Sequence, residues 1–284
     1  MTKRLGIIGG SGLSEMEGIG KLESHDIDTP FGKPSGSYMT GTLDNGTELV
    51  FLPRHGVGHV LNPSEVNYRA NIYGFKKMNV QWLLSVSAVG SLKENIAPKQ
   101  MFIPDQFFDF TRSGRPNTFF EKGIVAHVSL ADPVCETLRK SLIEATTKVG
   151  VEFNEGGGYI GMEGPQFSTR AESKFYRLLD MSVVGMTNLP EAKLAREAEI
   201  SYATLALVTD YDCWYESEDD VDVHMVLETV KHNIHNAKKI IQVLSDVFPG
   251  GDSPYKGTVK HAVQTSPDYI SAEAKERLAL LLSS

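Results

Sequence analysis

The sequence is poor in cysteine, which argues against both a disulfide framework and a cysteine metal site. Cys135 and Cys213 are the only two cysteines among 284 residues, and they are far apart in the chain. They form none of the short spacings that hold a metal ion, so no metal is expected. Free thiols in a reducing compartment are the simpler interpretation, and this predicts a cytoplasmic protein.

Long apolar runs and clusters of basic residues are also missing. No window approaches the roughly 18 apolar residues that a membrane span needs. The amino-terminal stretch becomes glycine-rich within a few residues, without the apolar core of a signal peptide. The formal net charge is −8, and no Lys/Arg run exceeds two residues. We therefore expect neither a membrane nor nucleic acid as a partner.

What the sequence does contain is an alternation of strand-like and helix-like segments. Strands are expected at Arg4–Ile8, Glu48–Leu52, Trp82–Val86, Met101–Ile103, Tyr159–Met162, Ser182–Gly185 and Ala203–Val208. Helices are expected at Pro63–Lys77, Pro133–Lys148, Thr169–Leu179, Pro190–Glu199 and about Val221–Phe248. This alternation predicts an α/β fold, a single domain with a central mainly parallel or mixed sheet flanked by helices. Pro249-Gly250-Gly251 marks a boundary between a domain at 1–250 and a carboxyl-terminal extension at 251–284, packed on the domain or on a neighbouring subunit.

Two carboxylates follow the apolar run Ala203–Val208. Asp210 and Asp212 would lie at the carboxyl end of a buried strand, where open α/β sheets bind their ligands. On an extended backbone, residues two apart point to one side. Neighbouring carboxylates resist double ionisation, so one could keep a proton and protonate a leaving group. The alternative is two acidic residues in a surface turn.

Glycines follow the first expected strand, in Gly9-Gly10-Ser11-Gly12. Glycine lets backbone N–H groups approach an anion closely, and the hydroxyl of Ser11 adds a donor. The stretch does not continue as G-x-G-x-x-G, and no Gly-Lys-Ser/Thr follows, so a dinucleotide or nucleoside triphosphate is disfavoured. A free phosphate and a plain glycine turn both remain open.

Polar residues also follow three other expected strands: Arg54-His55, Ser87-Ala88 and Thr187. Arginine binds phosphate oxygens with two parallel donors, and histidine can add another. Several such strand ends favour a phosphate cradle over unrelated turns. His59 belongs either to this site or to the structural scaffold.

A further unusual run covers residues 163–172. Glu163 ends an expected strand, and Phe167 could stack on a flat ring. Ser168 either contacts the same ligand or caps the helix that follows.

Taken together, these motifs resemble the 5′-methylthioadenosine phosphorylases of the trimeric purine nucleoside phosphorylase superfamily. The resemblance covers about residues 4–247. Its marks are GIIGGSGL at 6–13, DTPFGKPS at 28–35, RHGVGH at 54–59, NPSEVNYRANIY at 62–73, EGPQFSTRAES at 163–173, MTNLPE at 186–191 and ATLALVTDYDCW at 203–214.

The resemblance implies a set of binding residues. Phosphate is expected at Ser11, Arg54, His55, Ser87, the Ala88 backbone and Thr187. Met186 is expected under the ribose, with Phe167, Ser168, Asp210, Tyr211 and Asp212 around the base. Val223 is expected to line the pocket for the 5′-substituent, and His127 to reach a neighbouring subunit's site. A homotrimer follows, with further assembly into a dimer of trimers left open.

The resemblance also implies a reaction, the phosphorolysis of 5′-methylthioadenosine to adenine and 5-methylthioribose 1-phosphate. No cofactor is expected, because inorganic phosphate is a co-substrate. A protonated Asp210 would donate to N7 of the leaving adenine, and Asp212 would accept from its 6-amino group. An apolar Val223 favours a methylthio group over a hydroxyl. The alternatives are a 6-oxopurine or methylthioinosine phosphorylase and, from another class, a non-catalytic nucleoside-binding protein on the same fold.

Overall fold

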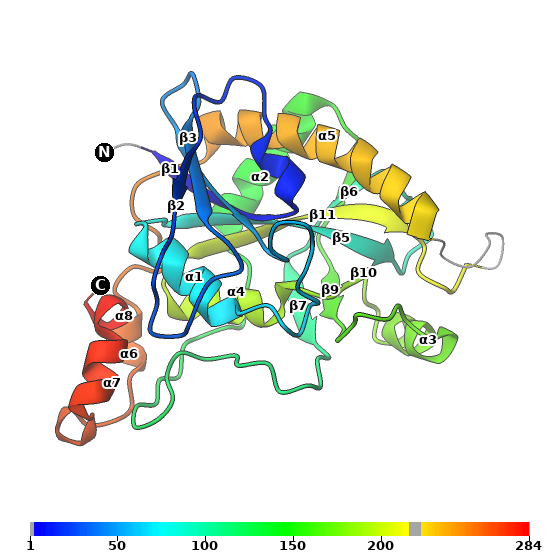
Figure 1. The fold of residues 1–284 in the computed structure, drawn as a ribbon. Helices are drawn as coiled ribbons and strands as arrows, with labels where there is room; N and C mark the ends of the chain where they lie inside the picture. Colours follow the sequence, from blue (N-terminus) through cyan, green and yellow to red (C-terminus); the bar gives the residue numbers. More distant parts are fainter. Residues whose placement is uncertain (1–2, 216–222, 284) are drawn as a thin grey trace.

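An eleven-stranded mixed sheet forms the centre of the protein, in a computed structural model that describes residues 3–215 and 223–283 (Figure 1). The strands are β1 Arg4–Gly9, β2 Glu23–His25, β3 Tyr38–Thr42, β4 Glu48–Pro53, β5 Trp82–Ser91, β6 Met101–Ile103, β7 Gln106–Asp109, β8 Phe153–Glu155, β9 Gly158–Gly161, β10 Val183–Gly185 and β11 Ser201–Asp210. One path through the sheet runs β2-β3-β4-β1-β5-β10-β9-β7, while β11 pairs with β5 and β6, and β8 with β6. The expected α/β class with a mainly parallel or mixed sheet is confirmed.

Helices cover both faces of this sheet (Figure 1). They are α1 Tyr68–Lys77, α2 Glu136–Val149, α3 Arg170–Leu178, α4 Asn188–Glu197, α5 Val223–Val247, α6 Val259–Ala262, α7 Ala272–Arg277 and α8 Ala279–Leu282, with short 3₁₀ turns at η1 Ser11–Ser14 and η2 Pro267–Tyr269. Helices α2 and α5 pack in one apolar cluster with the sheet, and α1 and α4 in another. No described helix is long and apolar enough to cross a membrane.

Strand β5 is the central element of the sheet. It pairs in parallel with β1 and β11 and, at its last two residues, antiparallel with β10. Most of its side chains are buried, as expected for a strand covered on both faces. Its ladders with β11, to Gly90, and with β10, to Ser91, extend the strand, so Ser87 and Ala88 lie within it and not at its end as the sequence predicted.

Several expected boundaries were wrong. The helix predicted from Pro63 begins at Tyr68, because the Asn67 side chain accepts from the Ala70 amide and caps it there. The helix predicted from Thr169 begins at Arg170. Its N-cap is Thr169 and not Ser168, because Thr169 and Glu172 form a reciprocal capping box.

Residues after 250 pack against the face of the sheet that carries α1 and α4. Val259, Ala274, Leu278 and Leu281 belong to the same apolar cluster as those helices. Trp82 Nε1 donates to the Gly251 carbonyl at 2.9 Å, and the Val259 amide donates to Glu199 Oε1 at 2.8 Å. Helices α6 to α8 therefore share one core with the α1 and α4 layer.

Candidate active site

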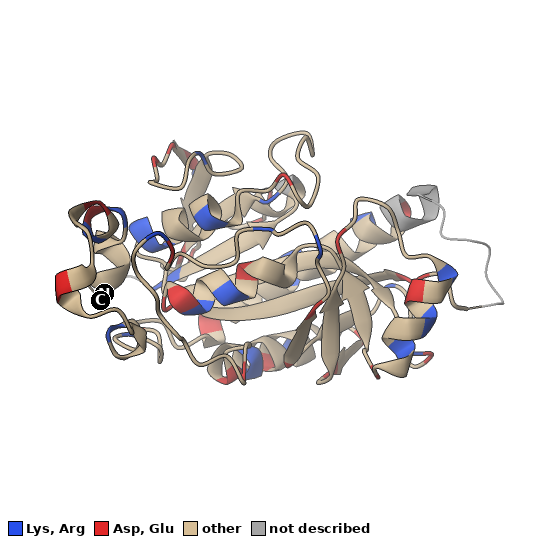
Figure 2. Cartoon of the chain, turned by 90° about the horizontal axis from the view of Figure 1, so that it is seen from below, with Lys and Arg blue, Asp and Glu red and all other residues tan. Residues whose placement is uncertain are grey.

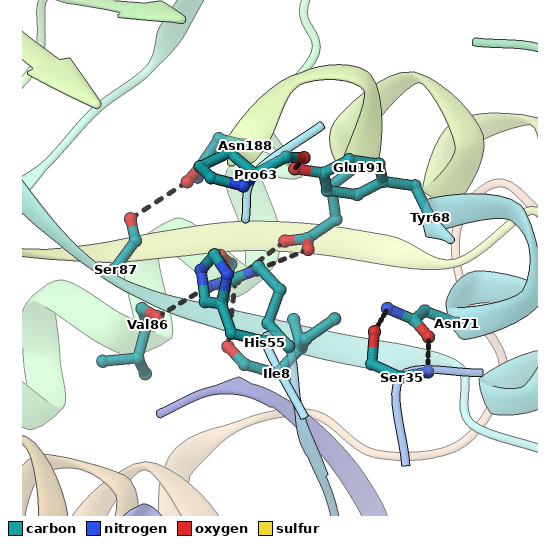
Figure 3. A network of polar contacts seen from close by, with 12 residues as sticks. Ile8, Ser35, His55, Pro63, Tyr68, Asn71, Val86, Ser87, Asn188 and Glu191 are labelled. Atoms are coloured by element: carbon teal, nitrogen blue, oxygen red, sulfur yellow. Dashed lines mark hydrogen bonds and ion pairs between the residues drawn. The ribbon is translucent and has the colours of Figure 1, made fainter. Parts of the chain in front are cut away.

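Arg54 lies directly after β4 and is 2% exposed. It forms a two-point ion pair with Glu191 of α4, with Nε 2.7 Å from Oε2 and Nη2 3.0 Å from Oε1. Nη2 also contacts Ile8 O and Ser85 Oγ, and Nη1 donates to Val86 O, in the network of Figure 3. Burial would lower the pKa of Arg54, but Glu191 outweighs it, so the guanidinium stays charged.

These contacts leave little of Arg54 for a ligand. Among the described residues, Nη1 donates only to Val86 O, so one of its two hydrogens is available to an anion. Sequence reasoning missed Glu191, although it lies in the MTNLPE motif. Tyr202 fixes this carboxylate further by donating to Oε1 at 2.8 Å.

His55 is held in one orientation beside Arg54. Its Nδ1 lies 2.8 Å from the Leu61 carbonyl, and its ring stacks on His59 at 4.4 Å. Burial, aided by Arg54, lowers the pKa of His55 to about 4, so the ring is neutral at pH 7. Because a carbonyl only accepts, Nδ1 carries the proton and Nε2 presents a lone pair. Nε2 therefore suits the hydroxyl of a hydrogen phosphate.

Ser87 and Thr187 come together through Asn188. Ser87 Oγ donates to Asn188 Oδ1 at 3.0 Å, and Asn188 in turn donates to Thr204 Oγ1 (Figure 3). Thr187 is 5% exposed and precedes α4, but its hydroxyl makes no capping bond. Leu189 has non-helical φ/ψ of −124° and 126°, so the regular turns of α4 begin after it and not directly at Thr187. Ala88, by contrast, is exposed.

The glycine turn after β1 is joined to Arg54 by a backbone hydrogen bond. The Arg54 amide donates to the Gly9 carbonyl at 2.9 Å, and a cavity of about 330 Å³ beside the turn is lined in part by Gly10, Ser14 and Pro53. Ser11 opens the turn η1, but its side chain lies outside the described part of the structure. The same holds for the side chain of Val223 at the start of α5.

Asp210 ends β11, and the chain turns sharply after it. Asp212 has φ +53°, and its amide donates to Asp210 Oδ1 at 2.8 Å. The extended backbone expected through Asp212 was wrong, because the chain turns there, yet both acids still lie against Gly90. Thr209 Oγ1 donates to Asp210 Oδ2 at 2.5 Å.

Asp212 has one carboxylate oxygen that is buried. This oxygen, Oδ2, makes no hydrogen bond of regular geometry among the described residues. Burial raises the pKa of Asp212, while the neighbouring hydroxyls of Ser173 and Ser168 oppose that rise. Gly90 lies against both acids: a Cβ there would be 3.0 Å from Asp210 Oδ1 and 3.3 Å from Asp212 Cβ.

The other residues expected to bind the nucleoside are partly exposed or hydrogen-bonded to neighbouring segments. Phe167 is 50% exposed, and the Ser168 carbonyl accepts from Cys213 Sγ at 3.3 Å. Tyr211 donates to the Glu94 carbonyl at 3.1 Å, which directs its hydroxyl to the loop after β5. His127 is exposed, on a segment joined to the Ala262 carbonyl by its amide.

Met186 is positioned by an arginine that sequence reasoning missed. Arg115 Nη1 donates to the carbonyls of Met186 at 2.7 Å and Leu189 at 3.0 Å, while Nη2 donates to the Glu163 carbonyl at 2.6 Å. Burial would raise the pKa of Glu163, but hydrogen bonds from Ser64, Ser113 and backbone amides lower it to about 2. Glu163 thus acts as a permanent anion that ties residues 112–115 to the segment after β9.

Across the described ranges, no three His, Cys, Asp or Glu side chains are arranged to hold a metal ion. The geometry instead groups the residues expected to bind phosphate beside β4, β5 and α4, with a carboxylate pair at the end of β11. This arrangement defines a site that can bind an oxyanion next to a base with a basic nitrogen.

Comparison with known proteins identifies the class. The model of the Phosphorylase superfamily matches residues 4–247, and the chain belongs to that family. Curated relatives are S-methyl-5′-thioadenosine phosphorylases: one from Geobacter sulfurreducens is 53% identical, covering 100% of this chain and 99% of the relative. Another, from Chloroflexus aurantiacus, is 49% identical, covering 97% of this chain and 96% of its own length.

Solved structures agree with this assignment. A methylthioadenosine phosphorylase sourced from an Antarctic soil metagenomic library superposes with a TM-score of 0.93 at 45% identity, covering 99% of this chain and 100% of that one. A methylthioadenosine phosphorylase from Schistosoma mansoni in complex with adenine has a TM-score of 0.85 at 35% identity, covering 92% and 99%. The resemblance expected from the motifs is confirmed.

Proposed function

We propose that this protein catalyses the phosphorolysis of 5′-methylthioadenosine to adenine and 5-methylthioribose 1-phosphate. One observation carries the proposal beyond family membership. Ser87, among the residues expected to bind phosphate, and Gly90, against the two aspartates, lie three residues apart on β5. At about 3.3 Å per residue, that spacing is about 10 Å, enough to place phosphate on one side of a ribose and a base on the other.

The proposed chemistry follows from these residue types. Phosphate attacks C1′ while the N9–C1′ bond breaks, and the electron pair of that bond goes to the base. Positive charge develops on the sugar, and the phosphate anion stabilises it. A carboxyl group of the Asp210–Asp212 turn donates its proton to N7, so the base leaves as neutral adenine. No cofactor enters the proposal, and phosphate is consumed as a co-substrate.

The aspartates also support an adenine base. The 6-amino group of adenine donates a hydrogen bond, and a carboxylate oxygen accepts it, whereas a 6-oxo group would suit an amide donor. Structures from S. mansoni were solved with adenine and, for a mutant form, with methylthioadenosine, which supports the same substrate here. A 6-oxopurine phosphorylase and a non-catalytic nucleoside-binding protein are the alternatives.

The deciding experiment compares kcat/KM for methylthioadenosine, adenosine, methylthioinosine and inosine, with and without phosphate. We expect phosphate-dependent release of adenine, fastest from methylthioadenosine. Faster release of hypoxanthine from the inosine substrates would favour the 6-oxopurine alternative. Binding without release of any base would favour the non-catalytic one.

We propose further that the protein works as a homotrimer in the cytoplasm. Its support is the exposed His127, which is free to meet a neighbouring subunit, together with the family resemblance. Light scattering should give about three times the chain mass of 31.2 kDa for a trimer, and about six times that mass for a dimer of trimers. A monomer with full activity would exclude a site shared between subunits.

A further inference from the structure

Tyr159 on β9 carries a hydroxyl group deep inside the protein. The residue is 0% exposed, and its hydroxyl makes no hydrogen bond of regular geometry among the described residues. A buried hydroxyl without a good partner costs free energy, so its presence calls for an explanation. The ring itself is held in place by Phe107, with 5.6 Å between the ring centroids and 76° between the planes. The phenol oxygen therefore has a defined position.

The side chain of Tyr159 crosses β10 on its way to β5. Strands β9 and β10 pair in parallel, and a Cβ added to Gly185 of β10 would clash with the Tyr159 oxygen. Glycine thus leaves the space in which the phenol lies. On the far side, Tyr159 shares an apolar cluster with Val89 of β5. Ser87 precedes Val89 by two residues and so faces the same side of the strand, which directs the phenol towards it.

The groups that face the phenol oxygen belong to the expected phosphate site. Burial raises the pKa of Tyr159, while the hydroxyl of Ser87 opposes that rise. Arg54 and the backbone N–H groups of Thr187 and Asn188 oppose it as well. Donors and positive charge near a phenol oxygen have this effect because they favour its charged form. Tyr159 therefore lies directly against residues that are expected to bind phosphate.

Ser87 is the acceptor available to the Tyr159 hydrogen in this group. The guanidinium of Arg54 and the backbone N–H groups of Thr187 and Asn188 can only donate. Ser87 Oγ gives its own hydrogen to Asn188 Oδ1 at 3.0 Å, so its oxygen keeps lone pairs with which to accept. The direction of donation therefore runs from Tyr159 to Ser87.

Neutral donors matter at this place because it holds little net charge. Figure 2 shows the charged residues mainly on the helices and loops around the sheet, and β5, β9 and β10 contain none. The charge of Arg54 is matched by that of Glu191. Phosphate binding here depends on hydroxyl and backbone donors, and donors whose positions are fixed in advance lose less conformational entropy when the ligand arrives.

We propose that Tyr159 is a positioning residue for phosphate, which holds Ser87 Oγ in place by donating a hydrogen bond to it. The inference rests on the proposed function, in which phosphate is the co-substrate. When the hydrogen of Ser87 turns from Asn188 to a phosphate oxygen, the bond from Tyr159 keeps Oγ where it is. The same bond polarises the Ser87 hydroxyl and makes it a stronger donor to the anion.

Tyr159→Phe tests the role, because it removes the hydroxyl and keeps the ring. We expect the KM for phosphate to rise about two- to tenfold, the range of one neutral hydrogen bond, with the KM for nucleoside unchanged. The denaturant midpoint should not fall, since the hydroxyl has no regular partner in the fold. Tyr38→Phe is the matched control: this buried hydroxyl donates to the Asn71 carbonyl at 2.7 Å, so its loss should lower the midpoint and leave the phosphate KM unchanged.

Calorimetric titration with inorganic phosphate, at an ionic strength held constant with NaCl, measures affinity without turnover. A wild-type protein that binds phosphate but releases no base would contradict the proposed function. A weaker phosphate affinity in Tyr159→Phe would support the role of Tyr159 even then. In a double-mutant cycle, Tyr159→Phe should add little to the loss caused by Ser87→Ala, because the two residues act together.

Four results would overturn the proposal. Phosphate affinity that is unchanged in Tyr159→Phe would show that the hydroxyl does not support binding. Losses that simply add in the double variant would show that Tyr159 does not act through Ser87. A variant that fails to fold, or that loses stability while both KM values rise equally, would assign the hydroxyl to the scaffold. Absence of phosphate binding in the wild-type protein would remove the site that Tyr159 is proposed to support.

Discussion

At the scale of single residues, Arg54 combines two tasks that the sequence could not separate. Its position after β4 predicted a phosphate ligand, and one Nη1 hydrogen remains available for that role. Its other donors hold Glu191, a carboxylate that is fully buried. A buried ion pair contributes modestly while intact, but removing one partner strands the other charge without solvent.

Arg54→Ala should therefore lower the free energy of unfolding by about 3–5 kcal/mol. It should also raise the KM for phosphate far more than that for nucleoside. Urea unfolding and phosphate kinetics measure the two effects. Lys148→Ala breaks an exposed pair with Glu144 and should cost less than about 1 kcal/mol. A folded Arg54→Ala enzyme with normal phosphate KM would leave Arg54 a structural role only.

Asp210 and Asp212 are expected to have different roles in the reaction, and substitutions can separate them. Asp210→Asn should reduce kcat on adenine nucleosides by roughly 10²–10⁴, the usual contribution of general acid catalysis. Asp212→Asn should cause a milder loss, since we assign Asp212 to the 6-amino group. Activity on inosine should fall less in Asp210→Asn, because an amide can donate to a 6-oxo group.

Because Asp212 has a buried oxygen, the two variants also test whether Asp212, and not Asp210, is the proton donor. Burial raises the pKa of Asp212, which favours its protonated form, so Asp212 is the alternative proton donor. If kcat falls much further in Asp212→Asn than in Asp210→Asn, the proton donor is Asp212. Near-normal turnover in both variants would remove acid catalysis from the proposal.

At the scale of elements, two neighbouring hydroxyl residues at the start of α3 have different roles: one caps the helix and the other lies near the proposed base site. Thr169 caps the helix in a reciprocal box with Glu172, while Ser168 lies one residue earlier, next to Cys213. Thr169→Ala should cost about 1 kcal/mol of unfolding free energy, with little change in nucleoside KM. Ser168→Ala should raise nucleoside KM and leave stability nearly unchanged. Equal losses of stability in the two variants would mean that Ser168 also supports the helix.

The sequence predicted the buried elements better than the exposed ones. The strands near Arg4–Ile8, Glu48–Leu52 and Ala203–Val208 are confirmed, because each is a compact apolar run. Strands β2, β7 and β8 were missed, because their residues are largely solvent-accessible and give no apolar run. Strand β3 was also missed although most of it is buried, because its sequence YMTGT mixes threonine and glycine with apolar residues. The boundary at residue 63 was misplaced since Asn67, rather than the proline, caps α1.

At the scale of the whole molecule, buried carboxylates join distant segments. Glu197 at the end of α4 accepts from the Phe119 amide at 2.6 Å and from Thr118 Oγ1 at 2.7 Å. Burial raises the pKa of Glu197 to about 7, against an ordinary value of 4.5. Below pH 4.5 the group is protonated in both folded and unfolded chains. As pH rises towards 7 only the unfolded chain ionises freely, so the folded state loses stability.

The unfolding free energy should therefore contain a component that decreases between about pH 4.5 and 7. Its size is at most about 3 kcal/mol, from 1.36 kcal/mol per pKa unit. Glu197→Gln should remove it, so the difference between wild type and variant should depend on pH only in that window. Denaturant unfolding at pH 5, 6, 7 and 8 measures this. A parallel pair of curves would show that Glu197 titrates normally.

Long-range pairs limit what sequence can reveal about such a site. The motifs mark the segments in which phosphate and base residues are expected. Arg54, however, meets Glu191 across 137 residues, and Arg115 meets Glu163 across 48. No local pattern marks these partners, because the fold alone brings them together. Arg115 lay in a polar loop that has no periodic apolar signal, and so it remained unnoticed.

The path of β5 has a consequence for how this site can change. Ser87 and Gly90 belong to a single strand whose ladders with β1, β10 and β11 fix its register. Adding or removing one residue between them would turn the following side chains to the opposite face of the sheet. Sequence drift in this family can therefore alter which base or 5′-group is accepted by exchanging side chains. The reach from the attacking oxyanion to the purine is therefore set by three residues of β5, opposite which β11 already carries one extra residue, Thr209.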